Sequence, residues 1–126
     1  MEIAAKHGAI RTYVGKRVED DAYVSVITEQ QGFVEAVELK PGYSLNIANH
    51  SPTGFEWGYA GSGPAQLALA LLLDALAFAD PEGDKRTREH IAKRNYQAFK
   101  AVHVQNWPKQ GWTMSVDEIL TWLNER

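Results

Sequence analysis

The most apolar run of the chain, Leu67 to Phe78, limits the possible folds more than any other feature. Leucines and one phenylalanine surround the axis of a helix here, with alanines between them, and a helix that is apolar on all sides is buried on most sides. Pro64 suits the first helical turn, and Ser62 or Gly63 can cap it. The sequence therefore predicts a buried central helix on which the other elements pack.

This predicted helix has two polar residues in its interior, Gln66 and Asp74. At 100° per residue they lie about 80° apart around the axis, so they can share one narrow polar edge. The apolar run to Ala79 holds 13 residues including Asp74, and a membrane span needs about 20. We therefore expect no membrane association.

The first half of the chain has the alternation and β-branched content of strands. We predict strands over Ala9–Val14, Ala22–Thr28 and Phe33–Leu39, with the last two forming an antiparallel hairpin. Tyr43–Ile47 is predicted as a fourth strand. Glu35 falls on the apolar face of the third strand, so the register of this strand with the second is less well defined.

The second half is mainly helical in pattern. Asp84 can cap a helix from about Lys85 to Ala101, and Val102–Trp107 reads as a short strand. Ser115 to Glu118 is a capping box that begins a last helix. The predicted fold is an α+β domain spanning residues 1–126, in which a small antiparallel sheet packs on the buried central helix and two amphipathic helices complete the core.

The chain has no cysteine, which excludes disulfides and thiolate sites and suits a reducing compartment. Met1 to Ala9 lacks the apolar segment of a signal peptide. We therefore expect a cytoplasmic protein. The oligomeric state is left open.

Aromatic residues and glycines gather in the loop from Gly54 to Pro64, ahead of the central helix. Phe55, Trp57 and Tyr59 could stack on a flat ligand while Glu56 accepts its N–H groups. The same aromatic residues could instead form a structural lid over the helix. Both interpretations remain open from the sequence.

The end of this loop, Gly61 to Pro64, could bind an anion, because a glycine turn before a helix exposes unpaired N–H groups at Ser62 and Gly63. The pattern is neither a P-loop nor a dinucleotide fingerprint. A tight turn with an N-cap explains the same residues. A small nucleotide- or phosphate-binding protein or enzyme is therefore an alternative function.

Titratable residues suggest no catalytic centre. The candidates for acid–base or metal chemistry are His50, Glu56, Asp74, His90 and His103. Their spacings match no ligand or catalytic motif. We predict no catalytic residue, no metal site and no cofactor.

The segment from Asp84 to Lys109 carries seven Lys or Arg and two acidic residues, a local charge of +5, so the rest of the chain carries −8 against the total of −3. Its predicted basic face consists of Arg86, Lys93, Arg94 and Lys100. These side chains could contact nucleic-acid phosphates or an acidic protein. A solvated helix face is the favoured explanation of the same residues.

The run from Ser51 to Ala70 holds an ordered motif: Ser-Pro, Gly-Phe-Glu-Trp-Gly-Tyr, Gly-Ser-Gly-Pro and Gln-Leu-Ala-Leu-Ala. It resembles the signature of an uncharacterised family of small bacterial, phage and plasmid domains, the DUF6166-like proteins. The resemblance implies a mobile-element setting, in which small interaction modules and inhibitors of host defence are frequent. It implies no substrate and no catalytic residues.

Our leading hypothesis is a non-enzymatic binding module that uses the loop from Gly54 to Pro64, with a protein or a small ligand as partner. It follows from the aromatic residues and glycines gathered ahead of a helix N-terminus. The nucleotide-binding alternative and nucleic-acid binding through the helix 85–101 stand beside it.

Overall fold

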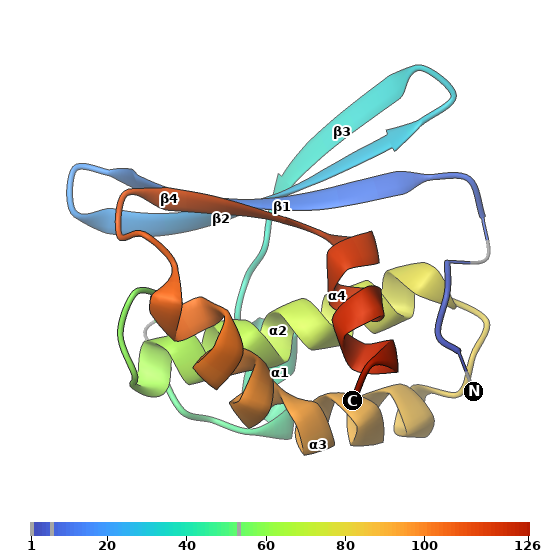
Figure 1. Ribbon diagram of the computed structural model, residues 1–126. Coiled ribbons are helices and arrows are strands. Elements are labelled where there is room, and N and C mark those ends of the chain that lie inside the picture. The colour runs from blue at the N-terminus through green and yellow to red at the C-terminus, as the bar shows by residue number, and fades with distance from the viewer. Residues whose placement is uncertain (1, 6, 53) are drawn as a thin grey trace.

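The computed structural model describes residues 2–5, 7–52 and 54–126, and arranges them as one sheet with helices on one face (Figure 1). The elements in chain order are β1 (Ile10–Val18), β2 (Asp21–Gln30), β3 (Phe33–Glu38), α1 (Gly42–Ile47), α2 (Ser62–Ala79), α3 (Lys85–Val102), the short 3₁₀ helix η1 (Val104–Asn106), β4 (Gly111–Ser115) and α4 (Val116–Asn124).

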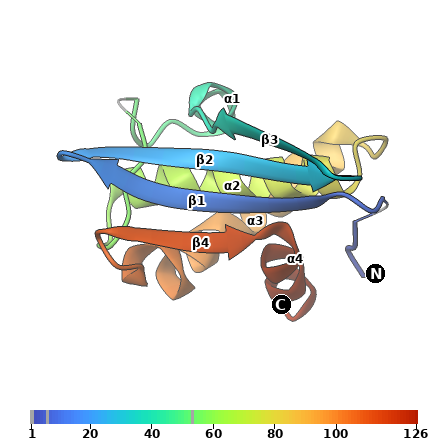
Figure 2. The ribbon, with the colours of Figure 1, turned by 90° about the horizontal axis from the view of Figure 1, so that it is seen from above.

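The four strands form one antiparallel sheet in the order β3-β2-β1-β4. Figure 2 shows the strands running over α2, with α4 below the end of β4. Tyr13 lies opposite Val26 on one side and Met114 on the other, and these three side chains face the helices from the buried side of the sheet. The α+β class predicted from the sequence is confirmed.

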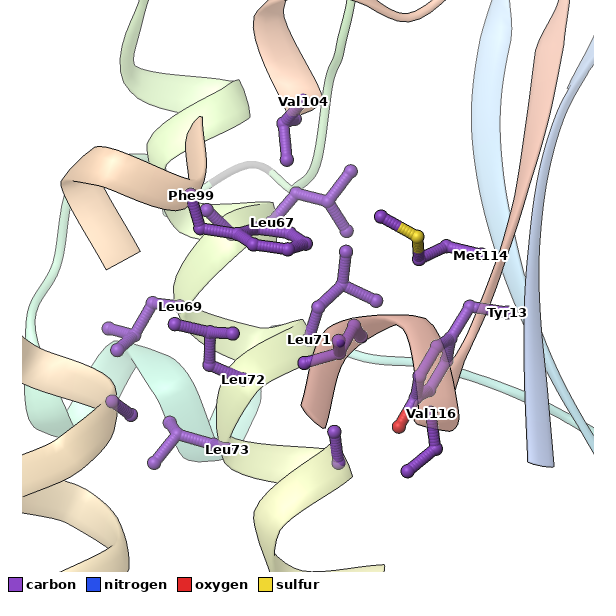
Figure 3. Packing of buried hydrophobic residues seen from close by; sticks show 14 of the residues in the cluster. Tyr13, Leu67, Leu69, Leu71, Leu72, Leu73, Phe99, Val104, Met114 and Val116 are labelled. Carbon is purple, nitrogen blue, oxygen red and sulfur yellow. The ribbon is translucent and has the colours of Figure 1, made fainter. Parts of the chain in front are cut away.

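The predicted central helix is α2, and fourteen of its 18 residues are buried. Figure 3 shows side chains from every layer converging on its leucines: Tyr13 and Met114 from the sheet, Phe99 from α3 and Val116 from α4. By length and composition α2 could also cross a membrane, but 78% of it is buried inside the domain. Burial on nearly all sides is what an all-round apolar helix requires in a protein core.

The predicted strand at Tyr43–Ile47 is wrong, because this segment is helix α1. The Ser44 hydroxyl and the Leu45 N–H both bond the Pro41 carbonyl oxygen, at 2.8 and 2.9 Å, and so begin a helical turn. The chain has left the sheet after Leu39. This segment is therefore helical and packs against α2, although its apolar alternation is typical of a strand.

The strand predicted at Val102–Trp107 is also wrong. There α3 ends at Val102 and η1 follows. The Asn106 side chain donates to the last carbonyls of α3, at Ala101 and Val102, 3.0 and 3.1 Å away. Asn106 thus ends the helix, a local effect that strand alternation does not reveal.

One strand was missed, and β1 was predicted to end too early. β4 contains only five residues and pairs with β1. β1 continues past Gly15 to Val18, because Gly15 is a site of close packing and not a turn: a Cβ there would lie 2.0 Å from Trp112 Nε1. Trp112 therefore requires a glycine on the neighbouring strand.

The start of α4 is confirmed in atomic detail. Ser115 Oγ accepts from the Glu118 N–H at 3.0 Å, and Glu118 Oε1 accepts from the Ser115 N–H at 3.1 Å. This reciprocal pair is the predicted capping box.

Candidate functional site

Gln66, one of the two polar residues inside α2, fixes the start of the loop that precedes this helix. Its side chain is fully buried. Oε1 accepts from the backbone N–H of His50 at 2.7 Å and of Ser51 at 3.2 Å, and Nε2 donates to Ser44 Oγ at 2.8 Å. The polar position predicted within the helix is therefore a structural anchor for the chain that leads from α1 into the loop.

Trp57 belongs to the core and not to an exposed platform. It is fully buried, packs edge-to-face on Trp112 at a ring distance of 5.7 Å, and donates from Nε1 to the Lys109 carbonyl oxygen at 3.1 Å. Gly58 follows with a φ of 87°, which glycine adopts readily. For Trp57 the structure agrees with the lid interpretation.

Glu56 forms an ion pair with Arg17 on β1. Arg17 Nη2 lies 2.6 Å from Oε1 and Nη1 lies 3.1 Å from Oε2, while Arg17 Nε donates to the Lys109 carbonyl oxygen at 2.7 Å. The hydrogen bond from Arg17 lowers the pKa of Glu56 below its ordinary value. Glu56 is thus held ionised and its oxygens are already engaged, which disfavours a role as a general base or as the main ligand acceptor.

An open cleft of about 570 Å³ lies between the start of β2, the β3–α1 connection and the loop. Four carboxylates line it, from Asp20, Asp21, Glu38 and Glu56. None of the described residues on its walls is Lys, Arg or His. We refer to this space as the acidic cleft.

The acidic cleft also contains most of the loop residues predicted as a site. Phe55, Tyr59, Ser62 and Gly63 line it together with Tyr23 of β2. Tyr59 is 44% exposed, whereas Phe55 is half-buried and packs partly on the core. The loop therefore divides into Trp57, which is buried, and a group of residues that face open space.

The first turn of α2 forms one wall of the acidic cleft. Its N-cap is Gly61, which has no side chain to bond the first N–H groups, and Ser62 is exposed. Gly63 lies against the loop, since a Cβ there would come within 2.6 Å of Glu56 Cβ. The glycine turn is thus required for packing and also opens onto the cleft.

An adjoining hollow of about 610 Å³ shares Asp20, Glu56 and Tyr59 with the acidic cleft. Arg17, Glu19 and Lys109 complete its charged lining. Lys109 Nζ lies 5.5 Å from the centre of the Tyr59 ring. Positive charge is therefore present beside the cleft, but it lies on the far side of Glu56 and Tyr59.

Of the titratable residues singled out in the sequence, His50, Glu56 and Asp74 are engaged by separate partners. His50 Nε2 lies 2.6 Å from the Tyr96 hydroxyl. Asp74 accepts from Arg11 at 2.9 Å and from the Tyr13 hydroxyl at 2.5 Å. His90 is exposed on α3, and burial lowers the pKa of His103. Across the described ranges, no three His, Asp or Glu side chains gather as a metal site would require.

Among the charged and aromatic residues that line the acidic cleft, four were not predicted as site residues: Asp20, Asp21, Tyr23 and Glu38. They come from the β1–β2 turn and from the strands beside it. The only sequence signal for them is the acidic run Glu19-Asp20-Asp21, which by itself is typical of a charged turn. Its position opposite the loop depends on how the sheet packs on α2.

The basic face lies on α3, below α2 in Figure 1. Arg86, Lys93 and Arg94 are exposed and Lys100 is half-buried. Within the described part of the chain, none of the four forms an ion pair. These side chains are therefore available, but they follow one helix and do not surround a deep hollow.

Comparisons with known proteins identify the family. A family model described as a family of unknown function (DUF6166) matches residues 13–125. No curated protein and no solved structure matches this chain. The family match includes the sheet, the loop and all the helices, and on this evidence the chain belongs to the DUF6166 family.

Proposed function

We propose that this domain is a non-enzymatic binding module that receives a positively charged group of a protein or small ligand in the acidic cleft. The observation that carries the proposal is the lining: four carboxylates and three aromatic side chains, with no cationic residue among the described walls. A cation placed there gains attraction from the carboxylates and from the faces of the aromatic rings.

The available carboxylates favour binding over catalysis. Glu56 is held by Arg17, while Asp20 and Asp21 are exposed at the β1–β2 turn. A general base requires a raised pKa and a reacting atom within reach. Exposed carboxylates beside aromatic rings act instead as a recognition surface for lysine, arginine or an amine.

The mobile-element setting implied by the motif at Ser51–Ala70 makes the proposal more specific. In that setting the partner would be a protein, and inhibition of a host defence component would follow from blocking one of its basic surfaces. The small size of the domain and its acidic cleft of about 570 Å³ support this type of role.

The proposal is tested by NMR titration with N-acetyl-arginine amide and its uncharged counterpart, N-acetyl-citrulline amide. We expect the arginine probe to shift the amide signals of Asp21, Tyr23, Tyr59 and Ser62, and the citrulline probe to leave them unchanged. Tyr59→Ala and Asp21→Asn should each weaken binding. Asp117→Asn on α4 is the matched control and should not.

Absence of shifts with the arginine probe would overturn the proposal. Equal shifts with both probes would also overturn it, because recognition would then not depend on charge. Since Tyr59 and Asp21 are exposed, their substitution leaves the core intact, and loss of binding reports on the cleft.

The nucleotide- or phosphate-binding alternative is favoured by one observation: the first turn of α2 opens onto the cleft at Ser62 without a capping side chain. The four carboxylates oppose it, because an anion would be repelled. A thermal-shift screen with nucleotides and phosphorylated metabolites decides between the two. A rise in Tm with an anionic compound, absent in Ser62→Pro, would establish the alternative.

Nucleic-acid binding through α3 rests on the exposed cations Arg86, Lys93 and Arg94. Contacts of this kind bind phosphates and weaken steeply with salt. An electrophoretic mobility shift with single- and double-stranded DNA and RNA tests it. Binding that is unchanged in Lys93→Glu/Arg94→Glu would remove this alternative.

A further inference from the structure

The free edge of β3 has features of a docking site for another strand. β3 lies at one end of the sheet beside β2, and no strand of the described ranges pairs with its other edge. All six of its residues are exposed, with Phe33, Val34 and Val37 exposed by 80%, 65% and 51%. Figure 1 shows the tip of the β2–β3 hairpin rising away from the helices, so that no helix covers this end of the strand.

The direction of the backbone groups follows from one hydrogen bond. The Leu39 N–H donates to the Val24 carbonyl oxygen at 2.8 Å, one step beyond the pair of Ser25 with Glu38. Hydrogen-bonded and non-bonded pairs alternate in an antiparallel ladder. Residues 33, 35, 37 and 39 therefore bond β2, and the N–H and C=O groups of Val34, Ala36 and Glu38 point away from the sheet.

This edge lacks most of the usual protection against pairing. Proteins blunt free edges with proline, lysine, bulges or a covering element. β3 contains no proline and no lysine, and its register with β2 is continuous from Glu38 to Phe33. Glu35, which projects among the apolar residues Phe33 and Val37, is its one charged interruption on that face.

Charge indicates what kind of strand fits. The hairpin from Ala22 to Glu38 carries three carboxylates, Glu29, Glu35 and Glu38, and no Lys, Arg or His. A second copy of β3 would bring more carboxylates to the same edge, and like charges in cross-strand proximity are destabilising. A segment with basic residues opposite Glu35 and Glu38 would be attracted instead.

We propose that β3 captures an extended basic segment of a partner protein, which adds to the sheet as a fifth, antiparallel strand. Backbone bonds to Val34, Ala36 and Glu38 hold the segment. Two Lys or Arg side chains three residues apart face Glu35 and Glu38, and apolar side chains cover Phe33 and Val37. Glu38 also lines the acidic cleft, but this site does not involve Tyr59 or Asp21, so substitutions of those two residues separate the two sites.

The test uses a labelled peptide, Lys-Val-Thr-Lys-Thr-Val, which in antiparallel order places its lysines opposite Glu38 and Glu35. Fluorescence anisotropy should show binding that weakens with salt. The matched peptide with glutamate in place of both lysines should not bind. Bound peptide should protect the amides of Val34, Ala36 and Glu38 from hydrogen exchange, while the Glu35 and Val37 amides are protected in the free protein as well.

Two variants of one residue separate edge pairing from other contacts. Ala36→Pro removes an outward N–H and leaves the bonds to β2, so peptide binding should weaken at least about tenfold. Ala36→Val keeps the N–H and should bind as the wild type does. Glu35→Lys/Glu38→Lys should reverse the preference toward the glutamate peptide, and this result does not depend on the folding of the proline variant.

Three results would overturn the proposal: no binding of the lysine peptide, equal binding by Ala36→Pro and wild type, or unchanged exchange at Val34 and Ala36. Dimers that Ala36→Pro dissociates would also overturn it, because the edge would then pair with a second copy. Tyr59→Ala should bind the lysine peptide normally, which distinguishes a failure here from a failure of the acidic cleft.

Discussion

Arg17 and Glu56 form a two-point ion pair that joins the sheet to the loop, with N–O distances of 2.6 and 3.1 Å. The Arg17 guanidinium also lies 4.7 Å from the centre of the Trp57 ring and bonds the Lys109 carbonyl oxygen. The Arg17 side chain thus contacts two loop residues, Trp57 and Glu56, and the backbone of Lys109 shortly before β4. The shape of the acidic cleft depends on this arrangement.

Arg17→Ala should destabilise the protein by about 1–2 kcal/mol, because it removes a partly exposed ion pair, a bond to a backbone carbonyl and a cation–π contact. Urea denaturation measures the change. The neighbouring Lys16 is exposed on the other face of β1, so Lys16→Ala should change stability by less than about 0.5 kcal/mol. Equal effects of the two variants would show that the Arg17 contacts contribute nothing.

Glu56 makes part of the stability depend on acid pH. The hydrogen bond from Arg17 lowers the pKa of Glu56 in the folded state below its ordinary value of 4.5. Its contribution is therefore complete above that ordinary pKa and is lost as the pH falls through the lowered value. The wild type should be more stable than Glu56→Gln at pH 6, and the difference should shrink as the pH is lowered toward 3.

Urea unfolding at a series of pH values measures this difference. Glu125→Gln provides a comparison, because Glu125 is exposed and forms no ion pair within the described residues. Its difference from the wild type should stay nearly constant. A constant difference for Glu56→Gln would mean that the ion pair does not favour the ionised form.

Trp57 and Tyr59 should respond in opposite ways to truncation. Trp57 is fully buried and Tyr59 is 44% exposed. Trp57→Ala should cost about 3–5 kcal/mol, as large-to-small changes in a core do, while Tyr59→Ala should cost less than about 1 kcal/mol. Thermal unfolding followed by circular dichroism measures both, and similar losses for the two would contradict their assignment to core and cleft.

Elements with strong local signals could be predicted from the sequence. The all-round apolar pattern of α2, the capping box at Ser115 and Glu118, and the β2–β3 hairpin each depend on neighbours within a few residues. Local propensity and tertiary packing agree in these elements, so the sequence pattern is sufficient to predict them.

Two of the errors, at α1 and β1, occurred where distant residues decide the local structure. α1 replaces a predicted strand because Ser44 meets Gln66, 22 positions later. β1 continues through Gly15 because Trp112 covers it from β4. A single residue and its neighbours carry no information about such contacts, and the same holds for the unpredicted walls of the acidic cleft at Asp20 and Asp21.

The loop from Gly54 to Pro64 shows most directly where prediction from the sequence ends. Phe55, Trp57 and Tyr59 alternate in the sequence, which predicts a common side for all three. The positive φ of Gly58 redirects the chain after Trp57, so Trp57 enters the core while Tyr59 faces the cleft. The burial of Trp57 agrees with the lid interpretation, whereas a binding role for the exposed Tyr59 stays a prediction.

Gln66→Ala should loosen the start of this loop more than it disturbs α2. The substitution leaves the His50 and Ser51 N–H groups and the Ser44 hydroxyl without their buried partner, while alanine remains a good helix former. Burial of unsatisfied groups should cost about 2–3 kcal/mol. Hydrogen exchange should accelerate at the His50 and Ser51 amides by more than it does at Leu71 in the helix.

Gln97, exposed on α3, provides the matched control, and Gln97→Ala should leave the His50 and Ser51 amides unchanged. If His50, Ser51 and Leu71 accelerated equally in Gln66→Ala, the glutamine would be supporting the whole fold and not the loop.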